Sequence, residues 1–367
     1  MDNIITAFKN VLTKAQKLNA SDIHLCVGTS WKYRINGQIV PIKNLPPLKQ
    51  SDTEAIVRHI ILLSKNFLGQ DMDDFIHLLQ DFDCSYSVSG VSRFRVNICR
   101  QRGTFSIVLR VIPFETPTID KLGLPSVIKN ISMEERGLIL VTGITGSGKS
   151  TTLAAIINHI NNSKPCKIVT IEDPIEYLHN EIKASVIQRE VGADTESFHK
   201  ALRATLRQDP DIILVGEMRD KSTIEIALKA AETGHLVLST LHTLDAPKSI
   251  QRIISVFDLN EQKILRERLS ATIKSVISQR LLRRADNKGR IAVFEIMRAT
   301  LTIQTCIKDE KKTDTIRDLI ASGGDQYGMQ TFDQHLMDLY NRKVIDLATA
   351  KSAASSPDDF ERDVQFV

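Results

Sequence analysis

Several features are scarce or missing in this sequence of 367 residues. No apolar run approaches the ~18 residues of a membrane-spanning helix, so we expect no span of that kind. The start, Met1-Asp2-Asn3-Ile4-Ile5, lacks the basic and apolar regions of a signal peptide, so we expect no secretory leader. The formal net charge is only +4 and is spread along the chain, which is weak evidence for nucleic acid or anionic lipid as a partner.

Cysteine is also sparse, and no C-x-x-C pair occurs. The five cysteines are odd in number and scattered: Cys26, Cys84, Cys99, Cys166 and Cys306. This pattern indicates neither a zinc site nor a disulfide framework, and it predicts free thiols in a reducing cytoplasm. The hydrophobic fraction of 42% and charged fraction of 25% are ordinary for a globular protein, and the length suggests about two domains.

One glycine-rich segment is the most informative feature that is present. Gly143-Ile144-Thr145-Gly146-Ser147-Gly148-Lys149-Ser150 fits G-x-x-x-x-G-K-[ST], the loop that wraps nucleotide phosphates. Residues 137–142 before it form an apolar, β-branched run typical of a buried strand, and residues 151–157 open as a helix. Because the motif requires this strand–loop–helix setting, a glycine-rich turn without a ligand is disfavoured.

The residue types of this loop explain its chemistry. Glycines allow successive backbone N–H groups to point at phosphate oxygens, and the helix N-terminus adds partial positive charge. Lys149 reaches the β- and γ-phosphates, and the Ser150 hydroxyl ligates Mg²⁺, with Thr151 behind it. The candidate nucleotide-binding residues here are Gly143, Thr145, Gly146, Ser147, Gly148, Lys149, Ser150 and Thr151.

Two β-like runs that end in acids are candidates for the metal and the attacking water. Residues 209–216 lead to Glu217, and a carboxylate at a strand end is how phosphate-loop folds reach Mg²⁺ or its water. Residues 168–177 contain Glu172, Asp173 and Glu176, which would repel a polyphosphate unless metal or arginine intervened. They are candidates to polarise water or hold Mg²⁺, and surface acids are the alternative.

A further strand-like run, residues 234–243, places Thr240 and His242 on one face at its end. Beside the phosphate-loop strand these side chains would read the γ-phosphate by hydrogen bonding, although ordinary core or surface histidines are the alternative. A metal site is not expected, because His235 and His242 lie at opposite ends of the run and face opposite ways.

Arginines gather in residues 92–102, with Arg110 close behind. At alternate strand positions they share one face, and arginine supplied by a neighbouring subunit can stabilise phosphoryl-transfer charge. Arg95 and Arg110 are therefore candidate catalytic residues, with a solvated surface strip as the alternative. Further candidates around residues 203–219 are Arg203, Arg207 and Arg219.

Periodicity predicts an α+β module over residues 1–112. Its expected helices are 4–18 and 51–80, its strands are 82–88, 93–100 and 104–111, and Asn36-Gly37 marks a hairpin. Prolines at 113, 117 and 125 predict a linker over 113–126.

Residues 127–367 alternate between strand and helix as a parallel sheet requires. The expected strands are 138–142, 167–172, 211–216 and 235–241. Beyond residue 260 we expect mainly helices, with one strand near 290–297.

Taken together, these segments resemble the secretion ATPase superfamily, and within it the twitching-motility (PilT-like) retraction ATPases of type IV pili. The matching segments span nearly the whole chain: Ser21–Leu25, Ser92–Asn97, Arg110–Pro113, Thr170–Tyr177, Gln188–Gly192, Leu206–Asp220, Glu232–Thr243 and Gly328–Asp333.

The resemblance implies a PAS-like N-terminal domain followed by a RecA-like ATPase domain with C-terminal helices, assembled as a homo-hexamer with nucleotide between the domains. It implies an ATPase motor in the cytoplasm, peripheral at the inner membrane, that pulls pilin through an inner-membrane platform protein, with another pilus ATPase as a further partner. ATP and Mg²⁺ are the implied cofactors, and Glu176, ahead of Glu172, is the implied water-polarising acid. Extension and type II secretion relatives usually carry a longer N-terminal region and paired C-x-x-C motifs, which this sequence lacks.

The sequence departs from this family at one place. Retraction ATPases commonly carry Ala-Ile-Arg-Asn-Leu-Ile near the C-terminus, where this chain has Thr302-Ile303-Gln304-Thr305-Cys306-Ile307. This departure leaves an accessory retraction paralogue open beside the principal retraction motor. Three further alternatives also stay open: a pilus extension ATPase, a secretion or DNA-uptake ATPase, and a non-hydrolysing nucleotide-dependent scaffold.

Overall fold

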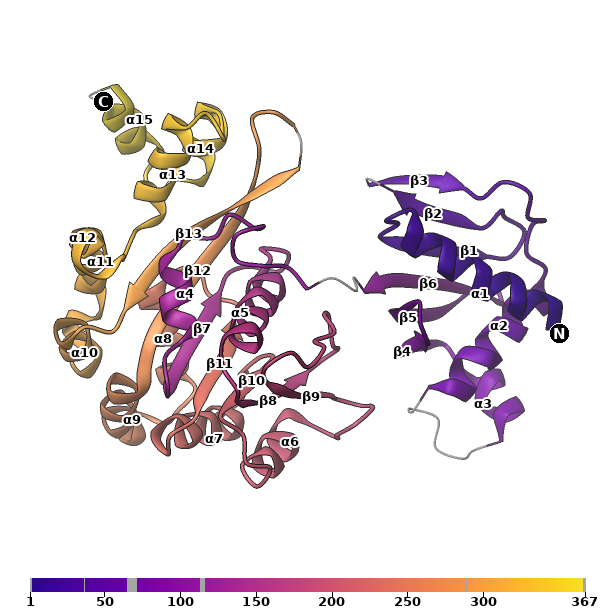
Figure 1. The fold of residues 1–367 in the computed structure, drawn as a ribbon, viewed down its shortest axis with the longest axis horizontal. Coiled ribbons are helices and arrows are strands. Elements are labelled where there is room, and N and C mark those ends of the chain that lie inside the picture. The colour runs from indigo at the N-terminus through magenta and orange to yellow at the C-terminus, as the bar shows by residue number, and fades with distance from the viewer. Residues whose placement is uncertain (1, 36, 65–70, 113–115, 288, 366–367) are drawn as a thin grey trace. The chain divides into compact units, whose positions relative to one another are not determined.

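The structure is a computed structural model that describes residues 2–35, 37–64, 71–112, 116–287 and 289–365 (Figure 1). By its internal contacts the chain divides into two compact units. The N-terminal unit contains Met1–Thr116 together with two later segments, Asp173–Leu178 and Glu190–Glu196. The C-terminal unit contains the rest: Pro117–Glu172, His179–Arg189 and Ser197–Val367.

The N-terminal unit is built on an antiparallel sheet with strand order β3-β2-β1-β6-β5-β4. Its strands are β1 (Asp22–Cys26), β2 (Lys32–Ile35), β3 (Gln38–Pro41), β4 (Asp81–Val88), β5 (Ser92–Gln101) and β6 (Thr104–Ile112), and its helices are α1 (Asp2–Lys17), α2 (Gln50–Leu63) and α3 (Met72–Leu78). Residues alternate between the two faces of a strand, so one face of β5 buries Phe94, Val96 and Ile98 while Arg93 and Arg95 lie on the other. The buried face joins Phe8 and Trp31 in a single apolar core.

The C-terminal unit is built on a sheet of order β13-β12-β7-β11-β10-β8-β9. Its strands are β7 (Gly137–Thr142), β8 (Lys167–Glu172), β9 (Ser185–Glu190), β10 (Ile212–Val215), β11 (Leu236–Leu241), β12 (Ile273–Arg283) and β13 (Arg290–Arg298). Strands β12, β7, β11, β10 and β8 pair in parallel, and β13 is antiparallel. Every residue of β7, β10 and β11 is buried, as expected when helices cover both faces of a parallel sheet.

Helices occupy most of the remaining C-terminal unit. They are α4 (Val127–Ser132), α5 (Lys149–Ser163), α6 (Phe198–Thr205), α7 (Lys221–Glu232), α8 (Ala246–Ser255), α9 (Leu259–Thr272), α10 (Leu301–Lys308), η1 (Glu310–Thr315), α11 (Ile316–Ser322), α12 (Gly324–Tyr327), α13 (Phe332–Asn341), α14 (Leu347–Ala353) and α15 (Pro357–Gln365). Helices α13 to α15 gather beside β12 and β13 (Figure 1), where Val293, Phe332 and Leu336 form a separate small core. None of the helices in the described ranges is long and apolar enough to cross a membrane.

The mixed α/β class and the parallel sheet are confirmed, but the sequence did not predict every strand of the C-terminal unit or the face of every arginine. Strand β12 replaces a helix expected beyond residue 260, and β9 was not expected. The polar residues of β12 gave its sequence the pattern of a helix with an exposed polar face. In the structure Ser275 and Gln279 are buried, and each donates a hydrogen bond to a backbone carbonyl that satisfies its polar side chain. Arg100 does not share the face of Arg95: it stacks on Phe105, 4.5 Å from the ring centre.

Two expectations fall partly on residues outside the described ranges. The hairpin turn after Ile35 includes residue 36, and the expected linker includes residues 113–115. On either side of that turn, β2 and β3 pair as antiparallel strands, with Ile35 opposite Gln38. The boundaries at 112 and 127 stay a prediction.

Candidate functional site

The phosphate-loop motif lies between β7 and α5, and its backbone admits only glycine at key points. Gly143 has φ of +146°, and a Cβ there would lie 2.5 Å from the Gln279 carbonyl oxygen and 2.6 Å from the Ser147 hydroxyl. Gly148, the N-cap of α5, has φ of +91°. Both positions are left-handed, where other residues are strained, so the loop keeps a close backbone cradle at the start of a helix.

Polar atoms of this loop fit a polyphosphate. The Lys149 ammonium donates to the carbonyls of Gly143 (2.8 Å) and Ile144 (3.1 Å), which holds it across the mouth of the loop. The Ser147 hydroxyl is buried and has no hydrogen-bond partner among the described residues. A buried hydroxyl, an ammonium and the N–H groups of a helix start suit phosphate oxygens.

Two acids lie at the same edge of the sheet as this loop. Because β7, β8, β10 and β11 run parallel, their carboxyl ends meet at one edge, where Glu172 ends β8 and Glu217 follows β10. The Gly216 N–H donates to the Ile171 carbonyl (2.8 Å), which ties the two strand ends together. Thr170 (2.6 Å) and Gln188 (3.2 Å) donate to one oxygen of Glu172 and fix its orientation.

Glu217 is surrounded by cationic and polar groups. The Arg219 guanidinium lies 2.8 Å from a Glu217 oxygen, and the His242 Nε2 atom lies 3.8 Å from the same oxygen. Partial burial and the nearby Lys149 charge lower the pKa of His242 against the opposing effect of Glu217, which favours the neutral ring. The Thr240 hydroxyl donates to the Gly216 carbonyl (2.6 Å), so it joins β11 to the strand end that carries Glu217.

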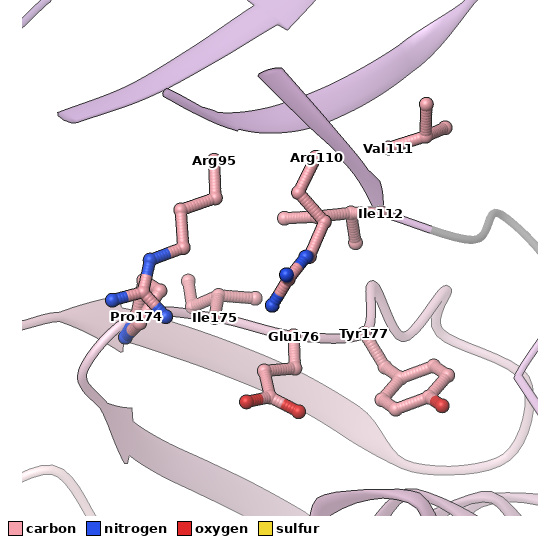
Figure 2. A pocket seen from close by; sticks show the side chains of 8 residues that line it. All are labelled: Arg95, Arg110, Val111, Ile112, Pro174, Ile175, Glu176 and Tyr177. Atoms are coloured by element: carbon pink, nitrogen blue, oxygen red, sulfur yellow. The ribbon is translucent and has the colours of Figure 1, made fainter. Parts of the chain in front are cut away.

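The N-terminal unit holds a second polar cluster. Arg95 and Arg110 are directly paired across β5 and β6, so they share one face. They line a cavity of about 190 Å³ with Pro174, Ile175, Glu176 and Tyr177, and Figure 2 shows both arginine side chains extending from their strands toward the segment that carries these residues. Arg110 also contacts Asp22, with Nε and Oδ1 3.2 Å apart.

The predicted site residues thus fall into two groups. The structure brings Lys149, Glu172, Glu217 and His242 to one sheet edge, and it brings Arg95, Arg110 and Glu176 together around a cavity in the other unit. Of the further arginine candidates, Arg219 contacts Glu217, whereas Arg207 donates to the Arg203 carbonyl at the end of α6.

Sequence reasoning missed two glutamines. Gln188 on β9 supports Glu172, and Gln279 on β12 is 2% exposed and donates to the Ser147 carbonyl (2.5 Å). A polar residue at an inward position of a strand was the available signal for Gln279, but β12 had not been expected as a strand.

Comparison with known proteins extends this geometry. The model of the type II/IV secretion system protein family matches residues 1–337. The type IV pilus retraction ATPase PilT of Pseudomonas aeruginosa is 44% identical over 350 residues, covering 95% of this chain and 98% of that protein. The twitching motility protein of Neisseria gonorrhoeae is 45% identical over 276 residues, covering 75% of this chain and 73% of that protein.

Solved structures agree with the fold. The crystal structure of the pilus retraction motor PilT with bound ADP has a TM-score of 0.86 at 43% identity, covering 96% of this chain and 98% of that one. The Legionella pneumophila ATPase DotB has a TM-score of 0.79 at 28% identity, covering 95% and 96%. The chain therefore belongs to the type II/IV secretion system protein family, as an ATPase of that family.

Proposed function

We propose that this chain is a mechanochemical motor that hydrolyses ATP with Mg²⁺ and powers type IV pilus retraction and twitching motility. The observation that carries the proposal is the single sheet edge at which Lys149, Glu172 and Glu217 follow parallel strands and a phosphate loop. Support for ATP comes from the ADP named for the PilT structure, and support for retraction comes from the names of the two relatives.

In this mechanism Lys149 and the backbone N–H groups around Gly146 and Gly148 hold the phosphates. The Lys149 ammonium already lies at the loop, where it donates to two loop carbonyls. On nucleotide binding it would exchange these hydrogen bonds for bonds to phosphate oxygens. The Ser150 hydroxyl would bind Mg²⁺, and Glu217 would hold the metal or its water. When bound, the metal ion neutralises charge that develops on the transferred phosphoryl group.

The remaining roles concern the water and the γ-phosphate. Glu176, by its position in the family-like segment Thr170–Tyr177, is the first candidate to polarise the attacking water, and Glu172 is the second. Thr240 and neutral His242 would sense the γ-phosphate from the end of β11. Arg95 and Arg110 would reach the nucleotide of a neighbouring subunit and stabilise transition-state charge.

The assembly that we propose is a homo-hexamer with a PAS-like domain of residues 1–112 and a RecA-like domain of residues 127–367. It would act in the cytoplasm, peripheral at the inner membrane at the pilus base, on an inner-membrane platform protein. We do not expect the protein to bind nucleic acid directly.

An accessory retraction role is the second candidate, and one local observation favours it. Helix α10 carries Gln304 within Thr302–Ile307, where retraction relatives place an arginine in a characteristic segment. We therefore expect replacement of Thr302–Ile307 by Ala-Ile-Arg-Asn-Leu-Ile to increase the retraction force if the missing arginine limits the force that this motor produces.

The Lys149→Ala variant tests the function directly. Purified wild-type protein should hydrolyse ATP in the presence of Mg²⁺, and Lys149→Ala should lose turnover, whereas Lys229→Ala, an exposed lysine on α7, should keep it. A deletion strain should be hyperpiliated and unable to twitch until the wild-type gene, but not the Lys149→Ala gene, is restored.

Other outcomes would contradict the proposal. Wild-type turnover in Lys149→Ala would overturn the phosphate-loop assignment. A bald deletion strain would indicate pilus extension, and wild-type protein that binds ATP without turnover would indicate a scaffold.

A further inference from the structure

The N-terminal unit contains a buried carboxylate that has no part in the mechanism above. Glu190 is 4% exposed and lies at the end of β9, at the start of the segment Glu190–Glu196. Burying a carboxylate is costly unless several donors surround it, so its partners must account for its position.

Three donors from three separate parts of the chain meet at this carboxylate. Its Oε1 accepts from the Ser85 hydroxyl on β4 (2.5 Å), and its Oε2 accepts from the Arg93 guanidinium on β5 (2.7 Å). The Oε2 atom also accepts from the backbone N–H of Ile175 (3.0 Å). Hydrogen bonds to a charged acceptor are short and strong, so these contacts bind the segment 173–178 to the sheet.

The segment held in this way carries Glu176. Ile175 is 3% exposed, and the next residue, Glu176, lies beside Arg95 and Arg110 in the cavity of Figure 2. Four residues form a row across the same face of the sheet, because they are paired directly from strand to strand. They are Ser85 on β4, Arg95 on β5, Arg110 on β6 and Asp22 on β1. Glu190 therefore fixes where Glu176 stands relative to this row.

The backbone around Glu190 is ordered by its own segment. The Glu190 N–H donates to the Asp194 carboxylate (3.0 Å), and the Glu190 carbonyl accepts from the Asp194 N–H (2.8 Å). The side chain is thus presented from a closed turn rather than from a free loop, and it is suited to act as a fixed anchor.

We propose that Glu190 is a positioning residue that anchors the acidic segment 173–178 to the arginine face of the N-terminal unit. The anchor assigns Glu176 to the N-terminal unit, whereas Glu172 and Glu217 belong to the unit that carries the phosphate loop. The effect on turnover rests on the proposed ATPase function, whereas the anchoring itself does not.

The test measures anchoring and turnover separately in the full-length protein. In Glu190→Gln, we expect amide hydrogen exchange in 173–178 to rise about tenfold or more while exchange in α5 stays unchanged, since one charged acceptor is lost. We expect kcat to fall about tenfold or more, with KM for ATP within about threefold, because the phosphate loop is intact. The matched control is Glu181→Gln, an exposed carboxylate that accepts from Ser185 and Val186.

A double variant separates positioning from stability. Glu190→Gln with Arg93→Met removes both partners of the buried ion pair, so it should recover thermal stability while 173–178 still exchanges fast and kcat stays low. Recovery of kcat together with stability would overturn the proposal, and so would wild-type exchange of 173–178 in Glu190→Gln. Fast exchange in that variant supports the anchor even if the wild-type protein proves to lack turnover, which would overturn only the proposed function.

Discussion

The bond between Gln279 and the phosphate loop supports a prediction that can be worked out in detail. The Gln279 Nε2 atom donates to the Ser147 carbonyl over 2.5 Å, and both residues are 2% exposed. Removing such a donor with Gln279→Leu costs about 1–3 kcal/mol. The Gln279 Oε1 atom has no partner among the described residues, so leucine relieves part of the burial penalty, and about 1–2 kcal/mol of net destabilisation is expected.

Part of this free energy should appear in nucleotide binding, because the bond orders the loop that holds the phosphates. Since about 1.4 kcal/mol corresponds to a factor of ten, we expect up to about tenfold weaker ADP binding. Urea unfolding gives the stability change, and titration with a fluorescent ADP analogue gives the affinity change. Gln251→Leu, an exposed glutamine on α8, is the control. Unchanged stability and unchanged affinity in Gln279→Leu would refute the reasoning.

Two further predictions concern carboxylates. Glu172→Gln and Glu176→Gln should both keep ADP binding. In single-turnover assays the rate of hydrolysis should fall more, by about a hundredfold or more, in the variant that lacks the water-polarising acid. Equal, small losses of rate in both variants would exclude that role for either residue. Burial raises the pKa of Glu295 to about 7 from 4.5, so the stability that its neutral form contributes is complete below pH 4.5 and is lost as pH rises through 7. The Glu295→Gln variant keeps an acceptor for the Ala246 N–H (2.8 Å) but does not titrate. Between pH 4 and pH 8 its free energy of unfolding in urea should therefore fall by roughly 3 kcal/mol less than that of the wild type. Parallel pH profiles of the two proteins would contradict the raised pKa.

The sequence predicted the features that depend on near neighbours. Strand β7, the glycine loop and α5 follow one another without interruption, and each carries its own periodicity or conformational signal. The acids and the histidine were expected at one edge of the sheet because each follows a strand, and parallel strands end at the same edge. These predictions needed no knowledge of contacts between distant residues.

Features that depend on distant partners were not predicted. Gln279 is separated by 132 residues from Ser147, and Glu190 is separated by 105 residues from Ser85 and by 97 from Arg93. A buried polar residue has no periodic signature until its partner is known, so the pattern of β12 resembled a helix surface. For the same reason, the assignment of Glu176 and Glu190 to the N-terminal unit could not be read from their place in the chain.

The discontinuous make-up of the N-terminal unit has a consequence for how the protein is made. A fragment that ends at residue 112 would contain Ser85 and Arg93 but not the carboxylate that both bind. During synthesis, the β4–β5 face would stay incomplete until Glu190–Glu196 had left the ribosome, when part of the second sheet had already been translated. The two units are therefore interleaved in the order of their synthesis, and the first is completed only after part of the second has been made.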